Sequence, residues 1–588
     1  MSYVAPVADM VFTLRHVIGV EKVPGLADDV ADGTLEAILE EAGKFAAERI
    51  APLNGVGDKV GSRLTDGVVT TPPGWKETYA DWIAGGWNAL PGPVEHGGQG
   101  LPAFLNAACI EMWNAASMAF GLCPLLTVGA VEALAAHGSR ELKERYLAKV
   151  VSGEWTGTMN LTEPQAGSDL SSLRTRAEPV GDGSFRIFGQ KIYITYGEHD
   201  LTENIVHLVL ARLPDAPAGT RGISLFLVPK ILPDGTRNDV FCGGLEHKLG
   251  IHASPTCTMV YGDRGGAIGW LIGEANKGLA CMFTMMNNAR LGVALQGVAI
   301  AERATQKAVQ YANERKQGKA PGAKAESVIA EHPDVKRMLL EMKAKTAAAR
   351  TLAYALAAEL DMSRRLADPA AREAAAERAS LLTPVAKAFA TDIGSEVASI
   401  GVQVHGGMGY VEETGAAQHL RDARIAAIYE GTNGIQAIDL VTRKLPLAEG
   451  RVVRAEIQRM RDTARRVAAQ NSPAFGHMAA RLRSAVDSLD RSTDWMLITL
   501  GRDPAEALAG ATPYLRLFAM ASGGANLAEE ALAAHALGLA GDADPDLARR
   551  ILRARFFAEN VAMSAPGLEA SIVEGAGSIT DADLVAAL

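Results

Sequence analysis

Glu430 stands out among the ionisable residues because it lies in a glycine-rich turn, residues 428–436, directly before a helical pattern. Gly431 and Gly434 have no Cβ, so the backbone beside the carboxylate can approach a ligand closely. The N–H groups of such a turn can polarise a carbonyl while the carboxylate removes a proton next to it. The turn therefore predicts proton abstraction beside a carbonyl. The simpler interpretation is that Glu430 only favours the positive end of a helix dipole.

Three further loops contain polar or glycine-rich sequences that could belong to the same site. Residues 161–169 read Leu-Thr-Glu-Pro-Gln-Ala-Gly-Ser-Asp, residues 193–195 read Tyr-Ile-Thr, and residues 403–410 read Gln-Val-His-Gly-Gly-Met-Gly-Tyr. Taken together with the Glu430 turn, these loops indicate a composite site. The 403–410 loop lacks the G-x-G-x-x-G spacing, and the sequence has no Walker loop, H-E-x-x-H or G-x-S-x-G, which disfavours a Rossmann-type nucleotide site.

Composition and charge exclude several classes of protein. The 588 residues suffice for three or four structural units at ~150 residues each. Asp and Glu (68) outnumber Lys and Arg (58) and no basic block occurs, which disfavours a nucleic-acid partner. The five cysteines show no C-x-x-C spacing, so we expect neither a metal site nor a disulfide framework. Because no leader-like segment opens the chain and no run approaches the ~18 apolar residues of a membrane span, we expect an unprocessed cytoplasmic protein without such a span.

Hydrophobic periodicity separates helical regions from one β-rich region. Apolar residues recur at helical spacing in both halves of the N-terminal part, at 35–53 and 103–151. Alternating patterns then predict short strands, with a turn at Gly189-Gln190. The predicted strands cover 185–187 and 192–194 on either side of that turn, then 206–210, 223–228 and 256–261.

Long Ala-rich segments beyond Gly278 predict a helix bundle, and further amphipathic stretches continue to about residue 566. The bundle helices are predicted at 278–316, 334–363, 372–401 and 433–444. We therefore predict a mostly α protein with a central β domain. Its four parts are an N-terminal extension with a helical domain, a β domain, a helix bundle that contains Glu430, and an appended helical domain. Their predicted bounds are 1–155, 156–277, 278–445 and 446–588.

With these elements in place, the sequence resembles the acyl-CoA dehydrogenase family over about residues 30–445. The resemblance rests on the T-E-P-x-A-G-S-D loop at Thr162, the Y-I-T strand at Tyr193, the Q-x-H-G-G-x-G turn at Gln403 and the Y-E-G-T turn at Tyr429. It implies an N-terminal helical domain, a β-barrel-like middle domain and a C-terminal helix bundle. The opening residues and the long C-terminal extension look like the large subfamily whose substrates include 3-(methylthio)propanoyl-CoA.

The resemblance implies that Glu430 removes the α-proton of an acyl-CoA while the β-hydrogen leaves as hydride to FAD. Desolvation should raise the pKa of this base towards the working pH. The backbone N–H of Glu430 and a flavin ribityl hydroxyl would stabilise the enolate oxygen. In a minority of the family the base precedes the arginine of the acyl-CoA loop, but here that position is Ala289, which cannot act as a base.

The resemblance also implies cofactor-binding and substrate-binding residues. Thr195 would face the flavin nitrogen that receives hydride, Tyr193 would cover the flavin face, and Arg290 would meet the nucleotide end of CoA. The cofactor-binding residues implied are Leu161, Thr162, Ser168, Tyr193, Thr195, Arg315, Gln403, Gly406, Gly407, Thr432 and Gly434. The substrate-binding residues implied are Ser168, Asn287, Arg290 and Gly431. Of these, Arg315 and the segment from Gln403 to Gly407 would hold the FAD pyrophosphate across a subunit boundary.

The resemblance thus predicts FAD-dependent dehydrogenation of 3-(methylthio)propanoyl-CoA to 3-(methylthio)acryloyl-CoA by a homodimer that passes electrons to electron-transfer flavoprotein. A general short- or medium-chain fatty acyl-CoA dehydrogenase is the alternative, because a thioether sulfur and a methylene are similar in size and one such group discriminates by only ~1 to 3 kcal/mol. A non-catalytic acyl-CoA- or flavin-binding scaffold and an acyl-CoA oxidase are two further alternatives.

Overall fold

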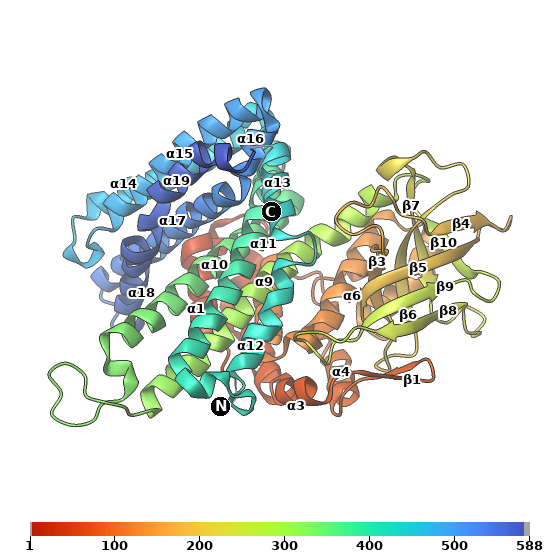
Figure 1. The fold of residues 1–588 in the computed structure, drawn as a ribbon, viewed down its shortest axis with the longest axis horizontal. Helices are drawn as coiled ribbons and strands as arrows, with labels where there is room; N and C mark the ends of the chain where they lie inside the picture. The colour runs from red at the N-terminus through yellow and green to blue at the C-terminus, as the bar shows by residue number, and fades with distance from the viewer. Residues whose placement is uncertain (1–2, 581–588) are drawn as a thin grey trace.

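A computed structural model describes residues 3–580 of the chain. The β sheet lies at one end of the molecule, the appended helices lie at the other, and long helices run between them (Figure 1). This arrangement confirms the prediction of a mostly α protein with a central β region and extra C-terminal helices. The bounds of the four predicted parts remain predictions, and the outermost residues of the first and last parts, 1–2 and 581–588, lie outside the described residues.

The N-terminal part is helical apart from one small hairpin. Its strands, β1 (Arg63–Thr65) and β2 (Val68–Thr70), are joined by Asp66 and Gly67, which both have positive φ angles. An Asp-Gly pair of this kind makes a two-residue hairpin turn, which the helical pattern alone did not predict. The helices are α1 (Val7–Phe12), α2 (Thr34–Phe45), α3 (Leu53–Val60), α4 (Trp75–Ala84), α5 (Ala103–Ala116), α6 (Met118–His137), α7 (Arg140–Leu142) and α8 (Ala148–Ser152).

Helix α6 differs from what the sequence predicted. Its residues, Met118–His137, are long and apolar enough to cross a membrane by length and composition, so the expectation that no segment approaches this limit is wrong. In the fold, however, 89% of its most apolar stretch is buried inside the protein. A core helix passes the same test of length and composition as a membrane span.

The central β region is one eight-stranded sheet. The order is β10-β7-β6-β4-β5-β9-β8, with β3 parallel to β6, and β10 also pairs with β5, which curls the sheet towards a barrel. The strands are β3 (Thr156–Asn160), β4 (Arg176–Pro179), β5 (Phe185–Thr195), β6 (Ile205–Arg212), β7 (Ile223–Pro229), β8 (Val240–Leu245), β9 (Thr256–Tyr261) and β10 (Ala267–Ile272).

The predicted turn at Gly189-Gln190 is wrong, because β5 runs through it without interruption. A Cβ on Gly189 would lie 2.5 Å from Thr175 Oγ1, so the glycine lets the neighbouring chain approach closely. The irregularity comes later, where the register with β9 shifts between Lys191 and Ile194. There Tyr193 adopts a φ of 60°, and its side chain is 60% exposed. A bulge at this point re-aims the tyrosine away from the sheet.

Three long helices form the centre of the bundle, and two of them touch through glycine. A Cβ on Gly297 would lie 2.2 Å from the carbonyl oxygen of Ala390, so these helices can pack backbone to backbone only because residue 297 is glycine. This approach brings the middle of α9 beside the middle of α11. The bundle helices are α9 (Gly278–Glu314), α10 (Pro333–Arg365), α11 (Pro369–His405), α12 (Ala416–Ala423) and α13 (Asn433–Asp439).

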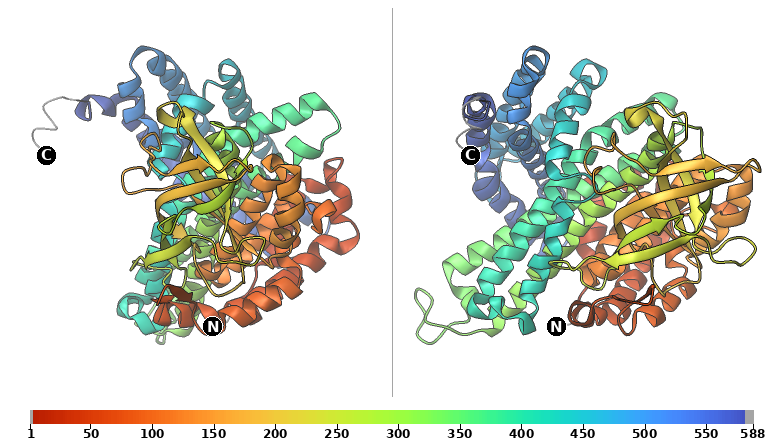
Figure 2. Two further views of the ribbon diagram at one scale, coloured as in Figure 1. Left: turned by 90° about the vertical axis from the view of Figure 1, so that its right-hand side faces the viewer. Right: turned by 45° about the vertical axis from the view of Figure 1, so that its right-hand side comes forward.

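The appended helices stack on the outer side of the bundle, as the turned views show (Figure 2). Helix α17 is their core: its small residues are buried, and Gly523 packs against Ala348 of α10. The helices are α14 (Arg451–Gln470), α15 (Met478–Arg502), α16 (Pro504–Ala509), α17 (Ala511–Leu539), α18 (Pro545–Phe556) and α19 (Ala565–Glu574).

Candidate active site

The Glu430 turn has two successive left-handed residues. Glu430 has a φ of 57° and Gly431 a φ of 82°. A non-glycine residue in this region costs on the order of 1 to 3 kcal/mol and persists only where its surroundings enforce it. The hydroxyl of Thr432 accepts the N–H of Ile435 at 3.2 Å and caps α13, so the strained turn ends in a helix start.

Two buried side chains hold the backbone of this turn. The Gln436 amide donates to the carbonyl oxygen of Glu430 at 3.1 Å. The Lys387 ammonium of α11 donates to the carbonyl oxygen of Gly431 at 2.8 Å and to the Asn433 side-chain oxygen at 3.0 Å. Both Gln436 and Lys387 are fully buried. The backbone on which the Glu430 side chain is mounted is therefore held by contacts from two separate elements.

The environment of Glu430 suits a base near neutral pH. Burial raises the pKa of its carboxyl group to about 7, and the charges of Arg290 and Lys387 partly offset that rise. The residue as a whole retains some exposed surface. A general base is most effective when its pKa lies close to the working pH.

A chain of polar side chains leads away from the residue before Glu430. The Tyr429 hydroxyl donates to the Gln296 side-chain oxygen, and the Gln296 amide nitrogen donates to Asn114 Oδ1 at 3.2 Å. Asn114 in turn lines a cavity of about 10 Å³ between α4, α5 and α6. Three tryptophans and several aliphatic residues complete the lining: Trp82, Trp87, Trp113, Ile110, Leu125 and Val128. The residue before the candidate base is thus connected by hydrogen bonds to a small aromatic cavity.

Arg290, which the sequence assigned to the substrate, lies close to the candidate base. Its guanidinium is 3.9 Å from Asp439 Oδ2 and donates to Asn287 Oδ1 at 3.4 Å. Only 7% of the residue is exposed, and its charge lowers the pKa of Glu430. Ala289 beside it is buried and carries no ionisable group. A contact between Arg290 and the nucleotide end of CoA stays a prediction.

Two predicted loops of the β region meet at one buried lysine. Lys191 donates to the carbonyl oxygen of Leu161 at 3.0 Å and to Glu163 Oε1 at 2.8 Å. The N–H of Ile192 donates to the carbonyl oxygen of Thr162 at 2.9 Å. These bonds join the 161–169 loop to the end of β5. The structure therefore brings Thr162 beside the strand segment that carries Tyr193 and Thr195.

This corner of the β region has the chemistry that an isoalloxazine ring requires. Tyr193 presents an exposed aromatic side chain, and the hydroxyls of Thr162 and Thr195 lie on residues that keep partial exposure. An aromatic face beside hydroxyl donors matches a planar ring with a polar edge. The residues present fit the flavin of FAD, although their individual roles stay predictions.

The residues predicted to hold the FAD pyrophosphate lie at the far ends of two long helices. Arg315 follows the last residue of α9, and at 1.5 Å per residue it is roughly 37 Å along that helix from Arg290. Gln403 and Gly406 lie at the end of α11, and an added Cβ on Gly406 or Gly407 would meet nothing within 4 Å. The contact of this group with FAD across a subunit boundary stays a prediction.

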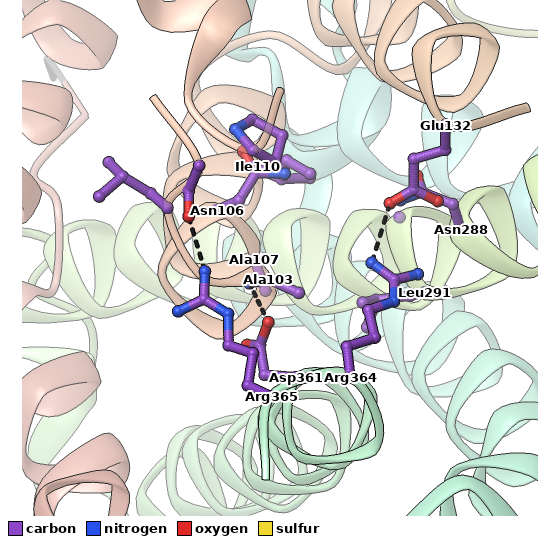
Figure 3. A pocket seen from close by; sticks show the side chains of 14 residues that line it. Ala103, Asn106, Ala107, Ile110, Glu132, Asn288, Leu291, Asp361, Arg364 and Arg365 are labelled. Carbon is purple, nitrogen blue, oxygen red and sulfur yellow. Dashed lines mark hydrogen bonds and ion pairs between the residues drawn. The ribbon is translucent and has the colours of Figure 1, made fainter. Parts of the chain in front are cut away.

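A second cavity, of about 170 Å³, lies between α5, α9 and the end of α10 (Figure 3). Arg364 pairs with Glu132 at 3.5 Å, and Asp361 accepts the N–H of Ala103 at 2.8 Å at the start of α5. None of the predicted site residues lines it. Its charged side chains partner one another, and two of its lining residues, Asn106 and Ile110, also line the small aromatic cavity.

Sequence reasoning missed several residues of the site. Lys387 is a lone charge in the apolar run 384–390, and Lys191 is a lone charge in a strand. A single charged residue in a buried segment requires a partner, so the sequence could have predicted a buried polar contact at both lysines. The sequence indicates such a contact less strongly at Gln296 and Gln436, since an uncharged amide is common on helices.

Comparison with known proteins matches most of the chain to one set of family models. Models described as the N-terminal, middle and C-terminal domains of acyl-CoA dehydrogenase match residues 33–154, 158–263 and 276–445. A model described as acetyl-CoA dehydrogenase C-terminal like matches residues 455–583.

Individual relatives cover nearly the whole chain. It is 46% identical to 3-methylmercaptopropionyl-CoA dehydrogenase of Ruegeria pomeroyi, over 99% of this chain and 100% of the relative. It is 34% identical to a butyryl-CoA dehydrogenase of Syntrophomonas wolfei, over 84% and 83% of the two chains. Its fold is similar to that of an acyl-CoA dehydrogenase from Bacillus anthracis solved in complex with FAD, with a TM-score of 0.76, 20% identity and coverage of 96% and 91%.

Proposed function

The chain belongs to the acyl-CoA dehydrogenase family, and from that premise we propose that it dehydrogenates a short acyl-CoA thioester with Glu430 as the base. It is an FAD-dependent oxidoreductase that acts on a CH–CH bond. Our first choice of reaction is 3-(methylthio)propanoyl-CoA to 3-(methylthio)acryloyl-CoA. The relative of Ruegeria pomeroyi, 46% identical, favours this substrate.

The observation that carries the proposal is the desolvated carboxylate on the strained turn. Glu430 takes the α-hydrogen of the thioester as a proton, and its pKa of about 7 keeps it basic enough to do so and acidic enough to release the proton afterwards. FAD, when bound, accepts the β-hydrogen together with its electron pair, which leaves a carbon–carbon double bond in the product. The Glu430 N–H is our proposed donor to the thioester oxygen.

The aromatic cavity supports a short acyl chain. At about 10 Å³ it holds no more than about one water molecule, so a long alkyl tail would have to displace tryptophan side chains. Trp82 and Trp113 pack edge to face with their ring centroids 4.3 Å apart, and Trp87 lies 5.8 Å from Trp113. A thioether sulfur gains ~0.3 to 1.5 kcal/mol against such rings. In our proposal the acyl chain points from Glu430 towards this cluster, where a short chain that ends in a methylthio group would contact the tryptophan rings.

A general short- or medium-chain fatty acyl-CoA dehydrogenase is the second candidate. The 34% identity to a butyryl-CoA dehydrogenase favours it, because a butyryl chain and a methylthiopropanoyl chain differ little in length. A non-catalytic scaffold would not need a desolvated carboxylate on a strained turn. An oxidase remains an alternative that peroxide release in air would reveal.

Cofactor and partner contacts complete the proposal. Thr162, Tyr193 and Thr195 hold the flavin ring of FAD, while Arg315 and Gln403 of a second copy hold its pyrophosphate, which makes a homodimer the functional unit. The remaining proposed contacts to FAD are Leu161, Ser168, Gly406, Gly407, Thr432 and Gly434. Asn287, Arg290, Ser168 and Gly431 are the proposed contacts to acyl-CoA. Electron-transfer flavoprotein is the proposed acceptor, and the five free cysteines suit a reducing cytoplasm.

Anaerobic bleaching of the flavin absorbance tests substrate and chemistry together. We expect 3-(methylthio)propanoyl-CoA to bleach the holoenzyme faster than butyryl-CoA, and octanoyl-CoA to bleach it slowly. Equal or faster bleaching by octanoyl-CoA would replace our substrate with a fatty acyl-CoA. The absence of bleaching by every thioester would favour the scaffold, and rapid stoichiometric peroxide in air would favour the oxidase.

A further inference from the structure

Lys387 is a buried cation that the proposed reaction does not yet use. It lies in the middle of α11 with none of its surface exposed. Its ammonium group donates to the carbonyl oxygen of Gly431 at 2.8 Å, one residue beyond the proposed base. A buried charge is costly unless it is hydrogen-bonded and balanced by an opposite charge. A lysine at this position should therefore have a role that a neutral side chain could not perform.

The hydrogen bonds of Lys387 continue through Asn433. The Asn433 side-chain oxygen accepts from Lys387 at 3.0 Å and from the Thr391 hydroxyl at 3.2 Å. Its amide nitrogen donates to Asp392 Oδ1 at 2.7 Å. The oxygen and the nitrogen of the Asn433 side chain thus both hydrogen-bond to α11, and they hold the first residue of α13 against that helix. The turn that carries Glu430 is fixed at its last carbonyl and at the helix that follows it.

The charges that face Lys387 come from three elements. Glu430 of the turn and Asp392 of α11 favour its charged form, whereas Arg290 of α9 opposes it. Burial is the largest effect and lowers the pKa of Lys387 to about 7. The carboxyl group of Glu430 has a pKa raised to about the same value. The two charges favour each other, so removal of one should change the titration of the other.

We propose that Lys387 is a positioning residue for the base: its ammonium group orients the Glu430 turn through the Gly431 carbonyl, and its charge favours the deprotonated form of the neighbouring carboxyl group. The inference rests on the proposed role of Glu430. The ammonium supplies two things at once, a donor to the Gly431 carbonyl and a positive charge. A methionine would supply neither, and a glutamine would supply only the donor.

Two neutral variants and one matched control test the charge directly. Lys387→Met and Lys387→Gln are compared with wild type, and Lys345→Met is the control, because Lys345 is another buried lysine of the bundle that pairs with Glu396 and Glu341. The protonation of Glu430 is followed by infrared difference titration of the holoenzyme. Its carboxyl band is identified by its loss in Glu430→Gln. The pH profile of kcat/KM is measured alongside.

Removal of the cation should raise the midpoint of the Glu430 titration by on the order of one pH unit, since an opposite charge at short range lowers a carboxyl pKa by about 1 to 3 units. The acid limb of kcat/KM should move by the same amount. Relative to wild type, the neutral variants should therefore lose about tenfold more of their kcat/KM at pH 6 than at pH 9. Lys345→Met should lower the melting temperature without moving either curve. Lys387→Arg keeps the positive charge, so the midpoint of its Glu430 titration should stay close to the wild-type value.

A carboxyl titration that is unchanged in either neutral variant would overturn the proposal. Failure of the proposed function gives a different result: Glu430→Gln would then retain turnover, while the infrared titration would still report whether Lys387 acts on the carboxyl group. If Lys387→Met does not fold, Lys387→Gln keeps a donor for the Gly431 carbonyl and decides the question. A shift seen equally in Lys345→Met would mean that loss of bundle stability, not the local charge, is its cause.

Discussion

Asp9, in the first helix of the chain, forms an ion pair with Arg550 of the appended domain, with 2.7 Å between Oδ1 and Nη1. Arg553 pairs with the other oxygen of the same carboxylate at 3.2 Å, and the Arg550 guanidinium lies 4.0 Å from the centre of the Phe12 ring. Glu530, fully buried in α17, completes the cluster. The N-terminal extension and the appended domain therefore stabilise each other, although they lie at opposite ends of the sequence.

We predict that Asp9→Asn loosens the appended domain. Burial alone would raise the pKa of Asp9, but Arg553 and Arg550 outweigh it and lower the pKa. A carboxyl with a depressed pKa contributes stability above its unfolded pKa of ~3.9, and that contribution is lost as pH falls through the folded value. At pH 7 the variant should lose about 1 to 3 kcal/mol of unfolding free energy. Hydrogen exchange across α18 measures the loss, and the exposed Asp28→Asn should show none.

Glu430→Gln should remove catalysis and leave the fold intact. A positioned general base contributes about 10² to 10⁴ in rate, so turnover should fall by at least that factor while bound flavin stays at the wild-type ratio. Glu413→Gln, on an exposed residue of the same region, is the control and should keep full activity. Wild-type bleaching rates in Glu430→Gln would move the base to another residue.

The same substitution should stabilise the protein at neutral and alkaline pH. The folded pKa of Glu430, about 7, lies above the unfolded value, so the folded state holds a proton that the unfolded chain has already released. Stability from this group is present below the unfolded pKa and falls as pH rises through 7. Because the side chain is partly exposed, we expect Glu430→Gln to gain no more than about 2 kcal/mol at pH 8. Urea unfolding at pH 5 should show a smaller gain, and an equal gain at both values would contradict the linkage.

Lys191→Met should weaken flavin binding through the 161–169 loop. Lys191 and Glu163 form a fully buried pair, and loss of one partner leaves an unpaired buried charge at a cost of about 3 to 5 kcal/mol. Burial alone would raise the pKa of Glu163, but Lys191 lowers it to about 2. We expect a lower flavin-to-protein absorbance ratio and a lower melting temperature. The double variant Lys191→Met/Glu163→Gln should recover part of the stability, and the exposed Lys149→Met should change neither quantity.

How much of the site the sequence could predict depends on the range of the interactions. The Glu430 turn depends on neighbours in the sequence, because Gly431 and the helix cap Thr432 lie within two residues of the carboxylate. A glycine followed by a threonine predicts a turn and the start of a helix. Lys387 and Gln296 act on that turn from other helices, and their contacts exist only once α9 and α11 have packed. Periodicity predicted those helices well, but it carries no information about which polar side chain meets which loop.

The prediction of the strands is limited in the same way, because it too lacks the contacts between distant segments. Alternation predicted the pattern of β5 correctly, yet it placed a turn at Gly189, because glycine inside a strand reads as a break when its neighbours are unknown. The structure explains the glycine by the close approach of Thr175, which lies on a different segment. The bulge that turns Tyr193 outward was likewise invisible, since it depends on the register with β9.

Trp113→Ala should shift the enzyme towards longer acyl chains. Trp113 is 3% exposed and lines the small cavity together with Asn114, which Gln296 connects to the residue before the base. Truncation enlarges that cavity, and if the acyl chain points towards it, the ratio of kcat/KM for octanoyl-CoA to that for 3-(methylthio)propanoyl-CoA should rise by about tenfold or more. The cost in stability should be about 3 to 5 kcal/mol, as for other buried aromatic truncations.

Trp270→Ala, a partly buried tryptophan of β10, is the matched control, because it removes an indole from another part of the molecule and should leave the ratio unchanged. An unchanged ratio in a folded, flavin-bound Trp113→Ala would mean that the acyl chain does not point towards the tryptophan cluster, and the structural support for a short substrate would then be lost.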